Sequence, residues 1–393
     1  MIKNDLYTEP PLRRNHWLAF VILGAGIFAC SLLGESWEIL ADGEQYIKMA
    51  TGEMVSAPFG YRILIPFLAQ TLPSNLISSF HLIALLALTF TGFFLYVFIS
   101  DIAKSKTNTD LFIIALLFLT SYLVFYYATT KVRVDPLALC ILSFLFYGMK
   151  QGQNIYWLTF MMVLGVITHE SILIFIPILW GMYFLDSELF NKNQYPLRHI
   201  LFFTGASLLV FAGTRIFIQI ESYSGFSYED GFEIIPYVIN HSGGIIEHMQ
   251  RIYAAFGPIW FLFCVQILFF EKWRSRVFAV FALLMNLLLT VAATDTLRVV
   301  SLFFPIIFYY SFKLLWSIKS NFQFGKLGII ALLTLQSYYS FVVFGHLRSF
   351  ETSTLLFFQA MLSSGLFLAV LSALLLIQFK TEKPSIPQYV DSH

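Results

Sequence analysis

The chain is poor in charge: Asp, Glu, Lys and Arg make up only 12% of its 393 residues, whereas 58% are hydrophobic. A soluble domain usually carries about 25% charged residues, so about half of the charge that keeps a folded surface in water is missing. The formal net charge of +1 gives no reason to expect nucleic acid as a partner. This composition excludes an ordinary soluble domain and indicates an integral membrane protein.

Cysteine is also scarce. Cys30, Cys140 and Cys264 each lie inside an apolar run, which excludes a disulfide framework and a cysteine-based metal site. The sequence contains no P-loop, Rossmann glycine pattern, His-Glu-x-x-His or Gly-x-Ser-x-Gly motif. Their absence argues against nucleotide-driven transport and against serine or zinc hydrolysis at known motifs. We predict no cofactor and no metal ligand set.

Apolar segments long enough to cross a membrane, which takes about 20 residues, are abundant. We predict an all-α polytopic transmembrane helix bundle of about 11–12 helices, formed by a single domain over residues 1–380 and followed by a short tail, 381–393. The stretch 156–185 could be one long tilted helix or two short helices separated by His169-Glu170. The candidate spans are 16–34, 77–99, 111–128, 136–149, 156–168, 171–185, 199–219, 253–270, 277–294, 299–316, 327–345 and 354–378.

The basic residues suggest an orientation. With a cytoplasmic N-terminus and two passes over 156–185, two thirds of the 24 Lys and Arg residues fall on the cytoplasmic side, as the positive-inside rule requires. A single pass would place Lys272, Arg274 and Arg276 outside. We therefore predict that both termini are cytoplasmic and that two long loops, about 35–76 and 220–252, face outward. The absence of a sorting signal favours a bacterial inner membrane.

The first outer loop holds the densest group of residues that could take part in catalysis or substrate binding. Tyr46, Met49 and Ala50 fall on one face of a predicted interfacial helix over 42–50. Asp42 can cap that helix, and its position just outside the first span also suits a general base, with Glu44 assisting. Arg62 could hold a phosphate through paired N–H bonds, or extend from a helix end toward water.

This loop resembles a known family. Asp42, Tyr46 and Ala50 open a D-x-x-x-Y-x-x-x-A stretch after a first membrane helix, and Pro58-Phe59-x-Tyr61-Arg62-x-Leu64-x-Pro66 follows. Together they resemble the GT-C class of polytopic glycosyltransferases. The resemblance implies transfer of a sugar from a polyprenyl-phosphate carrier, with an acidic residue of this loop as base. The chain has Asp42-Gly43-Glu44 instead of the D-x-D of some members, which leaves a divalent metal requirement open.

Three further groups of ionisable residues lie on the same predicted face: Lys131 with Arg133 and Asp135, His169 with Glu170, and Asp295 with Arg298. Each could bind substrate or merely form an internal ion pair, because a charge at the end of a span needs water, a partner or a ligand. An Arg133–Asp135 pair could anchor its own loop, and Asp295 and Arg298 could pair across one helical turn. The predicted substrate-binding residues, with those of the first loop, are Tyr46, Arg62, Lys131, Arg133, His169, Glu170, Asp295 and Arg298.

The sequence therefore predicts a transferase that moves a sugar from a polyprenyl-phosphate donor to a glycan, lipid or protein acceptor, with membrane lipid around it and a role in cell-envelope glycan assembly. A transporter or flippase of a lipid-linked substrate is the main alternative. A polysaccharide polymerase or ligase is a further alternative and is chemically close to the transferase. Such enzymes are expected to concentrate arginines in a large outer loop, whereas the only arginine in loop 220–252 is Arg251.

Overall fold

The computed structural model describes residues 12–32, 41–56, 58–103, 108–185, 189–190, 192–218, 245–291, 296–320, 325–340 and 354–381. Over these residues the chain is helical and contains no strand, so the all-α prediction is confirmed for them. Asp295, most of loop 220–252 and the tail lie outside the described residues.

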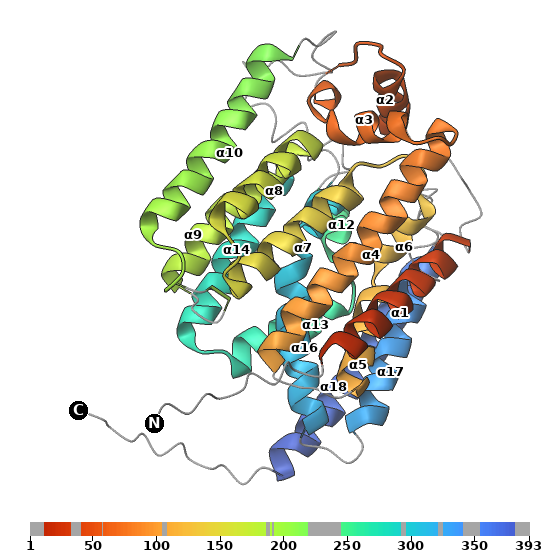
Figure 1. Cartoon of the computed structure of the whole chain (residues 1–393). Helices are drawn as coiled ribbons and strands as arrows, with labels where there is room; N and C mark the ends of the chain where they lie inside the picture. The colour runs from red at the N-terminus through yellow and green to blue at the C-terminus, as the bar shows by residue number, and fades with distance from the viewer. Residues whose placement is uncertain are drawn as a thin grey trace.

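The described chain forms seventeen α-helices together with short 3-10 and π-helical turns (Figure 1). The α-helices are α1 (Leu12–Leu32), α2 (Ala41–Ala50), α3 (Leu64–Thr71), α4 (Leu76–Ala103), α5 (Asn108–Leu119), α6 (Tyr122–Thr129), α7 (Asp135–Gln151), α8 (Ile155–Thr168), α9 (Phe175–Leu185), α10 (Leu197–Phe217), α12 (Ile245–Ala254), α13 (Ile259–Val265), α14 (Trp273–Val291), α15 (Thr296–Ser301), α16 (Phe304–Ser320), α17 (Gly325–Tyr338) and α18 (Thr354–Thr381). The turns are η1 (Phe59–Tyr61), η2 (Glu170–Ile174) and the π-helical η4 (Gln266–Phe270).

Within the described residues, four helices are long and apolar enough to cross a membrane, namely α4, α10, α14 and α18. A fifth is counted if α12 and α13, bent by 84°, form one span. The other predicted spans correspond to shorter or interrupted helices. Residues 111–128, for example, divide into α5 and α6 because Ser121 is extended and its hydroxyl accepts from Val124 N at 3.4 Å, which caps α6. The helices of the described residues therefore support four or five candidate spans, and the count of 11–12 membrane passes stays a prediction.

The stretch 156–185 forms two helices instead of one long tilted helix. α8 ends at Thr168, and His169 is extended, with φ −161° and ψ 117°. After α9 the chain returns to the region where α8 began. This proximity is shown by the hydrogen bond that Tyr195 Oη donates to Gln153 O at 2.6 Å. α8 and the segment after it therefore run in opposite directions, with His169-Glu170 at their junction.

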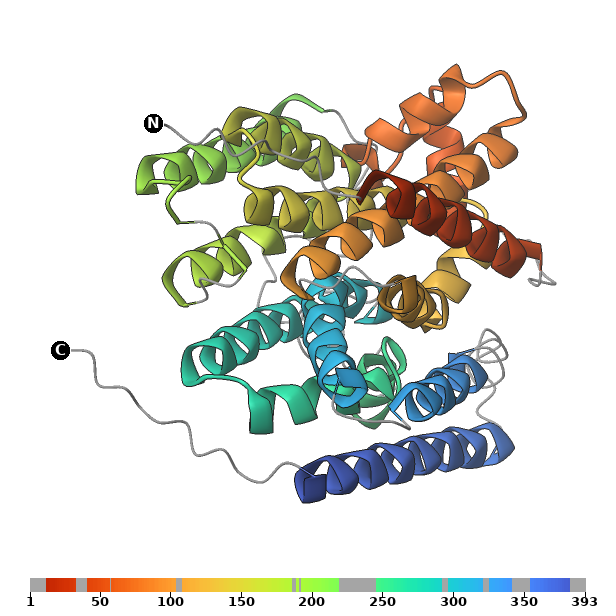
Figure 2. The same cartoon turned by 60° about the horizontal axis from the view of Figure 1, so that its bottom comes forward.

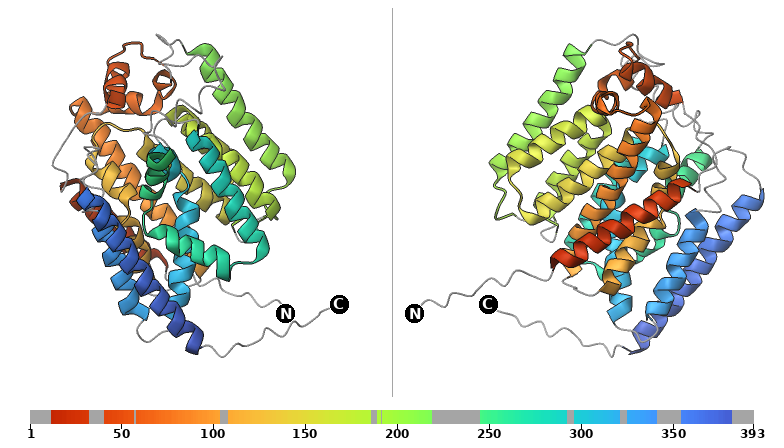
Figure 3. Two further views of the ribbon diagram at one scale, coloured as in Figure 1. Left: turned by 180° about the vertical axis from the view of Figure 1, so that it is seen from behind. Right: turned by 45° about the vertical axis from the view of Figure 1, so that its right-hand side comes forward.

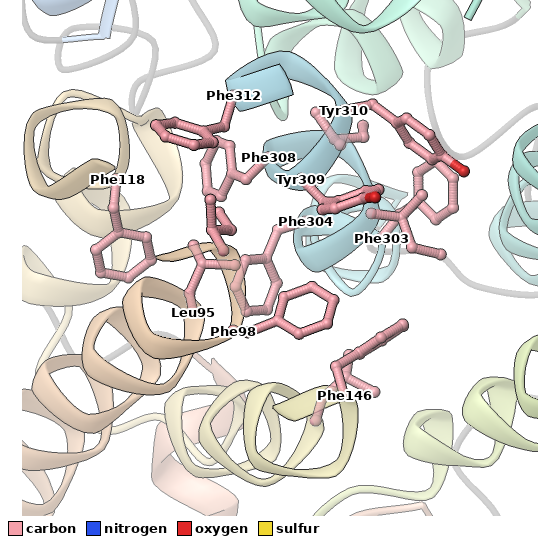
Figure 4. Close-up of a cluster of buried hydrophobic side chains, with 14 of the residues drawn as sticks. Leu95, Phe98, Phe118, Phe146, Phe303, Phe304, Phe308, Tyr309, Tyr310 and Phe312 are labelled. Atoms are coloured by element: carbon pink, nitrogen blue, oxygen red, sulfur yellow. The ribbon is translucent and has the colours of Figure 1, made fainter. Parts of the chain in front are cut away.

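The core is aromatic and joins α4, α5, α7 and α16. Figure 4 shows Phe98 and Leu95 of α4 facing Phe304 and Phe308 of α16, with Phe146 of α7 beside them. α4 packs along α7 and α1, and this group holds the centre of the bundle. α18 lies at the outside against α17 (Figures 2 and 3).

α2 and α3 form a short layer across one end of the bundle, above the start of α4 (Figure 1). The predicted interfacial helix over 42–50 agrees with α2, and the predicted face is the packed one: Tyr46 and Ala50 are buried against Ile65, Ala69 and Phe80. Asp42 is not the residue before the helix, because α2 begins at Ala41. Its carboxylate is therefore available for contacts beyond its own helix.

Candidate functional site

A group of charged side chains gathers beneath α2, at the end of the bundle where α7 and α15 begin. Arg133 Nη1 lies 3.0 Å from Asp42 Oδ2, and Arg298 Nη1 pairs with the same oxygen. Arg298 also clasps Asp135 with two bonds, Nε to Oδ1 at 2.9 Å and Nη2 to Oδ2 at 2.8 Å. Residues separated by as many as 256 positions thus form one ion-pair network.

A second ion pair lies beside the first. Arg62 Nε and Nη2 donate to the two carboxylate oxygens of Glu170 at 3.0 and 2.6 Å, and Arg62 Nη1 donates to Tyr46 Oη at 2.7 Å. Arg62 is only 7% exposed, so the alternative in which it extends toward water does not hold. The paired geometry suits a carboxylate as well as a phosphate, and in this structure Glu170 occupies it.

His169 links the two pairs. Its Nδ1 accepts from Ser171 N at 3.2 Å, which caps η2, and its Nε2 lies 3.6 Å from Asp135 Oδ1. The ring therefore has its hydrogen on Nε2, toward the carboxylate. The network runs from α2 through the starts of α7 and α15 to the α8–α9 junction.

The local sequence explains how these side chains reach one place. Asp135 is in the first turn of α7, where Pro136 suits the helix start and a carboxylate is stabilised by the helix dipole. Arg133 lies just before α7, and its Nη2 donates to Tyr126 Oη at 2.9 Å. Arg298 lies in the six-residue helix α15, whose packing on α14 fixes its direction.

Asp42 is the most accessible acid in the network. Its side chain is 28% exposed, whereas that of Asp135 is 7% exposed. Burial alone would raise the pKa of Asp42, but the guanidinium groups of Arg298 and Arg133 outweigh it and lower that pKa below its usual range. Asp42 is therefore ionised at neutral pH, and both arginines stabilise its charge.

The structure gathers most of the predicted site residues, but it places some of them differently. Glu44 is exposed, two residues from Asp42 and therefore on another face of α2. Lys131 is half-buried and lies within electrostatic range of His81 on α4. Asp295 lies outside the described residues, so its predicted pairing with Arg298 stays a prediction; among the described residues Arg298 pairs with Asp42 and Asp135.

Tyrosines beside Arg298 were not predicted. A hollow of about 10 Å³ is lined by Tyr122, Tyr126, Tyr127 and Arg298, among others. That volume holds roughly one water molecule. The sequence does contain a pattern that could have predicted them: Tyr122 and Tyr126 are spaced i and i+4 on a helix that leads into the loop of Arg133.

The donor set does not suit a metal ion. Over the described residues, no three His, Cys, Asp or Glu side chains come close enough together to hold one. The accessible carboxylate, Asp42, is already held by two guanidinium groups, whose charge opposes a cation at that position.

No protein-family model, curated protein or solved structure matches this chain.

Protonation of His169 is expected to make stability depend on pH. Burial, reinforced by Arg62, lowers the pKa of His169 to about 4, against about 6.5 for an unfolded histidine. Between these values the unfolded chain binds a proton that the folded chain does not, so the free energy of unfolding falls as pH is lowered from about 6.5 to 4, by at most about 3 kcal/mol. Thermal unfolding across this range measures it.

The matched variant is His169→Asn, because asparagine can still accept at the start of η2 but does not titrate. Its unfolding temperature should fall less steeply over the same pH range, since His81 and His248 contribute equally to both proteins. Identical pH profiles for the two proteins would show that His169 does not control this dependence.

Proposed function

We propose that this chain is a GT-C-like glycosyltransferase that moves a sugar from a polyprenyl-phosphate carrier to an acceptor at the end of the bundle covered by α2. The observation that carries the proposal is the accessible carboxylate of Asp42 held by two arginines from distant segments, Arg133 and Arg298. One group of side chains thus supplies a base and two phosphate ligands within bonding distance of each other.

In the proposed reaction, the donor phosphate takes over the bonds that Arg133 and Arg298 make to Asp42. The freed carboxylate then has a higher proton affinity and accepts the proton of the acceptor hydroxyl. The acceptor oxygen bonds to the anomeric carbon as the bond from that carbon to the phosphate oxygen breaks. The carrier phosphate leaves as an anion, and the arginines stabilise its charge.

Other features of the site support this reading. Asp135 keeps Arg298 oriented through a bidentate pair, so that arginine can exchange Asp42 for a phosphate without losing all its partners. The tyrosine-lined hollow adjoins Arg298, and aromatic rings suit the apolar faces of a sugar. Its small volume indicates that α2 or α15 must shift to admit substrate. In this proposal the site faces outward, and both termini lie in the cytoplasm of a bacterial inner membrane.

A release assay tests the proposal. The purified chain is incubated in detergent with a panel of radiolabelled polyprenyl-phosphate sugars and a host membrane extract as acceptor source. Release of polyprenyl phosphate together with labelled acceptor supports a transferase. If the chain binds the carrier and moves it across vesicle bilayers without releasing polyprenyl phosphate, the result supports the alternative function, a transporter of a lipid-linked substrate.

A further inference from the structure

A second pocket lies at the end of the bundle opposite Asp42. It is formed by α16, the π-helical turn η4 at the end of α13, and Ile99 near the end of α4, and its volume is about 270 Å³. In Figure 1 α13 and α16 are labelled in the lower half of the bundle, while α2 and α3 lie at its top. Ligand pockets begin at about 300 Å³, so the space suits a group the size of a lipid headgroup. π-helical turns often mark functional sites.

One residue of the pocket lining carries a buried hydrogen-bond acceptor with no partner among the described residues. Gln266 is 4% exposed and lines the pocket. Its Nε2 donates to Glu271 Oε1 at 2.7 Å, but its Oε1 receives no hydrogen bond. Leaving such a buried acceptor without a hydrogen bond is unfavourable. A ligand that donates an O–H here would remove that cost.

Lys313 lines the pocket, and further basic residues follow η4 along the chain. Lys313 Nζ lies 2.6 Å from Glu271 Oε1, so this carboxylate is already neutralised. Arg276 is exposed and is held beside it by a bond from its Nε to Glu271 O at 2.7 Å. Lys272 and Arg274 are exposed on the neighbouring turn. The excess of positive charge favours an anion, and a guanidinium fixed at one nitrogen can still bind phosphate through the others.

Exposed apolar side chains lie on η4 and at the start of α14. Leu268, Phe269 and Trp273 are 61%, 69% and 66% exposed. In a bilayer, the first two would contact acyl chains, and a tryptophan beside basic residues is typical of the membrane–water interface. The occupant therefore combines a phosphate, a hydroxyl donor and apolar chains.

We propose that this pocket binds the headgroup of an anionic, hydroxyl-bearing phospholipid of the phosphatidylglycerol type. The phosphodiester contacts Lys313 and Arg276, a glycerol hydroxyl donates to Gln266 Oε1, and the rings of Tyr309 and Trp316 flank the glycerol. Basic pockets between transmembrane helices bind anionic headgroups in this manner. The site is independent of the proposed transferase reaction.

Lipid binding to the delipidated full chain in detergent tests the proposal, by native mass spectrometry with phosphatidylglycerol, chain-matched phosphatidylcholine and soluble glycerol 3-phosphate as probes. Ser317 lines the pocket outside the Glu271–Lys313 pair, so Ser317→Leu fills the space and Ser317→Ala is its control. Arg276→Gln removes the fixed guanidinium, and Arg274→Gln removes an equal charge nearby. Phosphatidylglycerol should bind at least tenfold more tightly than the other probes. Ser317→Leu and Arg276→Gln should each weaken it about tenfold, and the two controls should not.

Equal binding of phosphatidylcholine would overturn the proposal, as would equal loss in Arg276→Gln and Arg274→Gln, which would indicate a general charge effect. Binding of glycerol 3-phosphate as tightly as the lipid would show a soluble phosphate site instead. Because Arg276 is exposed, its variant keeps the fold and gives a result even if Ser317→Leu unfolds.

Discussion

Arg298→Gln is expected to lower the free energy of unfolding by about 3–5 kcal/mol, because removing one partner of a buried ion pair leaves the other charge uncompensated. The side chains of Arg298 and Asp135, which are joined by two hydrogen bonds, are each only 7% exposed. Thermal unfolding in detergent measures the loss. Arg274→Gln, at an exposed position of α14, should change stability by no more than about 0.5 kcal/mol.

A double variant separates the burial of an unpaired charge from the loss of packing. Arg298→Met with Asp135→Leu removes both charges and keeps apolar volume, which is often neutral or stabilising for a buried pair. We expect it to recover most of the stability that Arg298→Gln loses and to remain inactive in the release assay. A double variant as unstable as the single one would contradict the ion-pair explanation.

Asp42→Asn is expected to reduce the rate of polyprenyl phosphate release by about 10²–10⁴-fold, the range for loss of a positioned general base. Stability should change by only about 1 kcal/mol, because the Asp42 side chain is 28% exposed. Arg298 keeps Asp135 and Arg133 keeps Tyr126 in the variant. The fold and the phosphate ligands should therefore survive.

Glu53→Gln is the matched control, since Glu53 is an exposed carboxylate shortly after α2 whose Oε1 accepts from the Thr51 hydroxyl at 3.0 Å. It should keep wild-type activity. Full activity in a folded Asp42→Asn protein would remove Asp42 as the base. Equal losses in both variants would point to a general requirement for acidic charge on this layer.

The helical class and the packed face of α2 could be predicted because both follow from local patterns. Long apolar runs predict helices, and the spacing of Tyr46 and Ala50 predicts one buried face. The breaks were harder to predict. A single serine hydroxyl at Ser121 separates α5 from α6, and hydropathy averaged over a window does not detect such a cap.

The members of the site could be predicted better than their partners. Charged residues at span ends are rare and need compensation, which identified Arg62, Arg133, His169 and Arg298. Local spacing suggested pairs within each loop, such as Arg133 with Asp135. Among the described residues, the structure joins Arg62 to Glu170 and Arg298 to Asp42, across 108 and 256 residues. Such pairings depend on tertiary packing, which spacing along the chain does not encode.

The 256-residue separation of Asp42 and Arg298 also has a consequence for biosynthesis. A ribosome that adds about 5–20 residues per second needs roughly 13–51 s to proceed from the first of these codons to the second. During that interval α2 has been made, but one of the two guanidinium partners of Asp42 has not. The nascent chain therefore passes through a stage in which its first helices exist and its ion-pair network is incomplete. Only after α15 has been made can this network form completely, so the site is completed after synthesis of most of the protein.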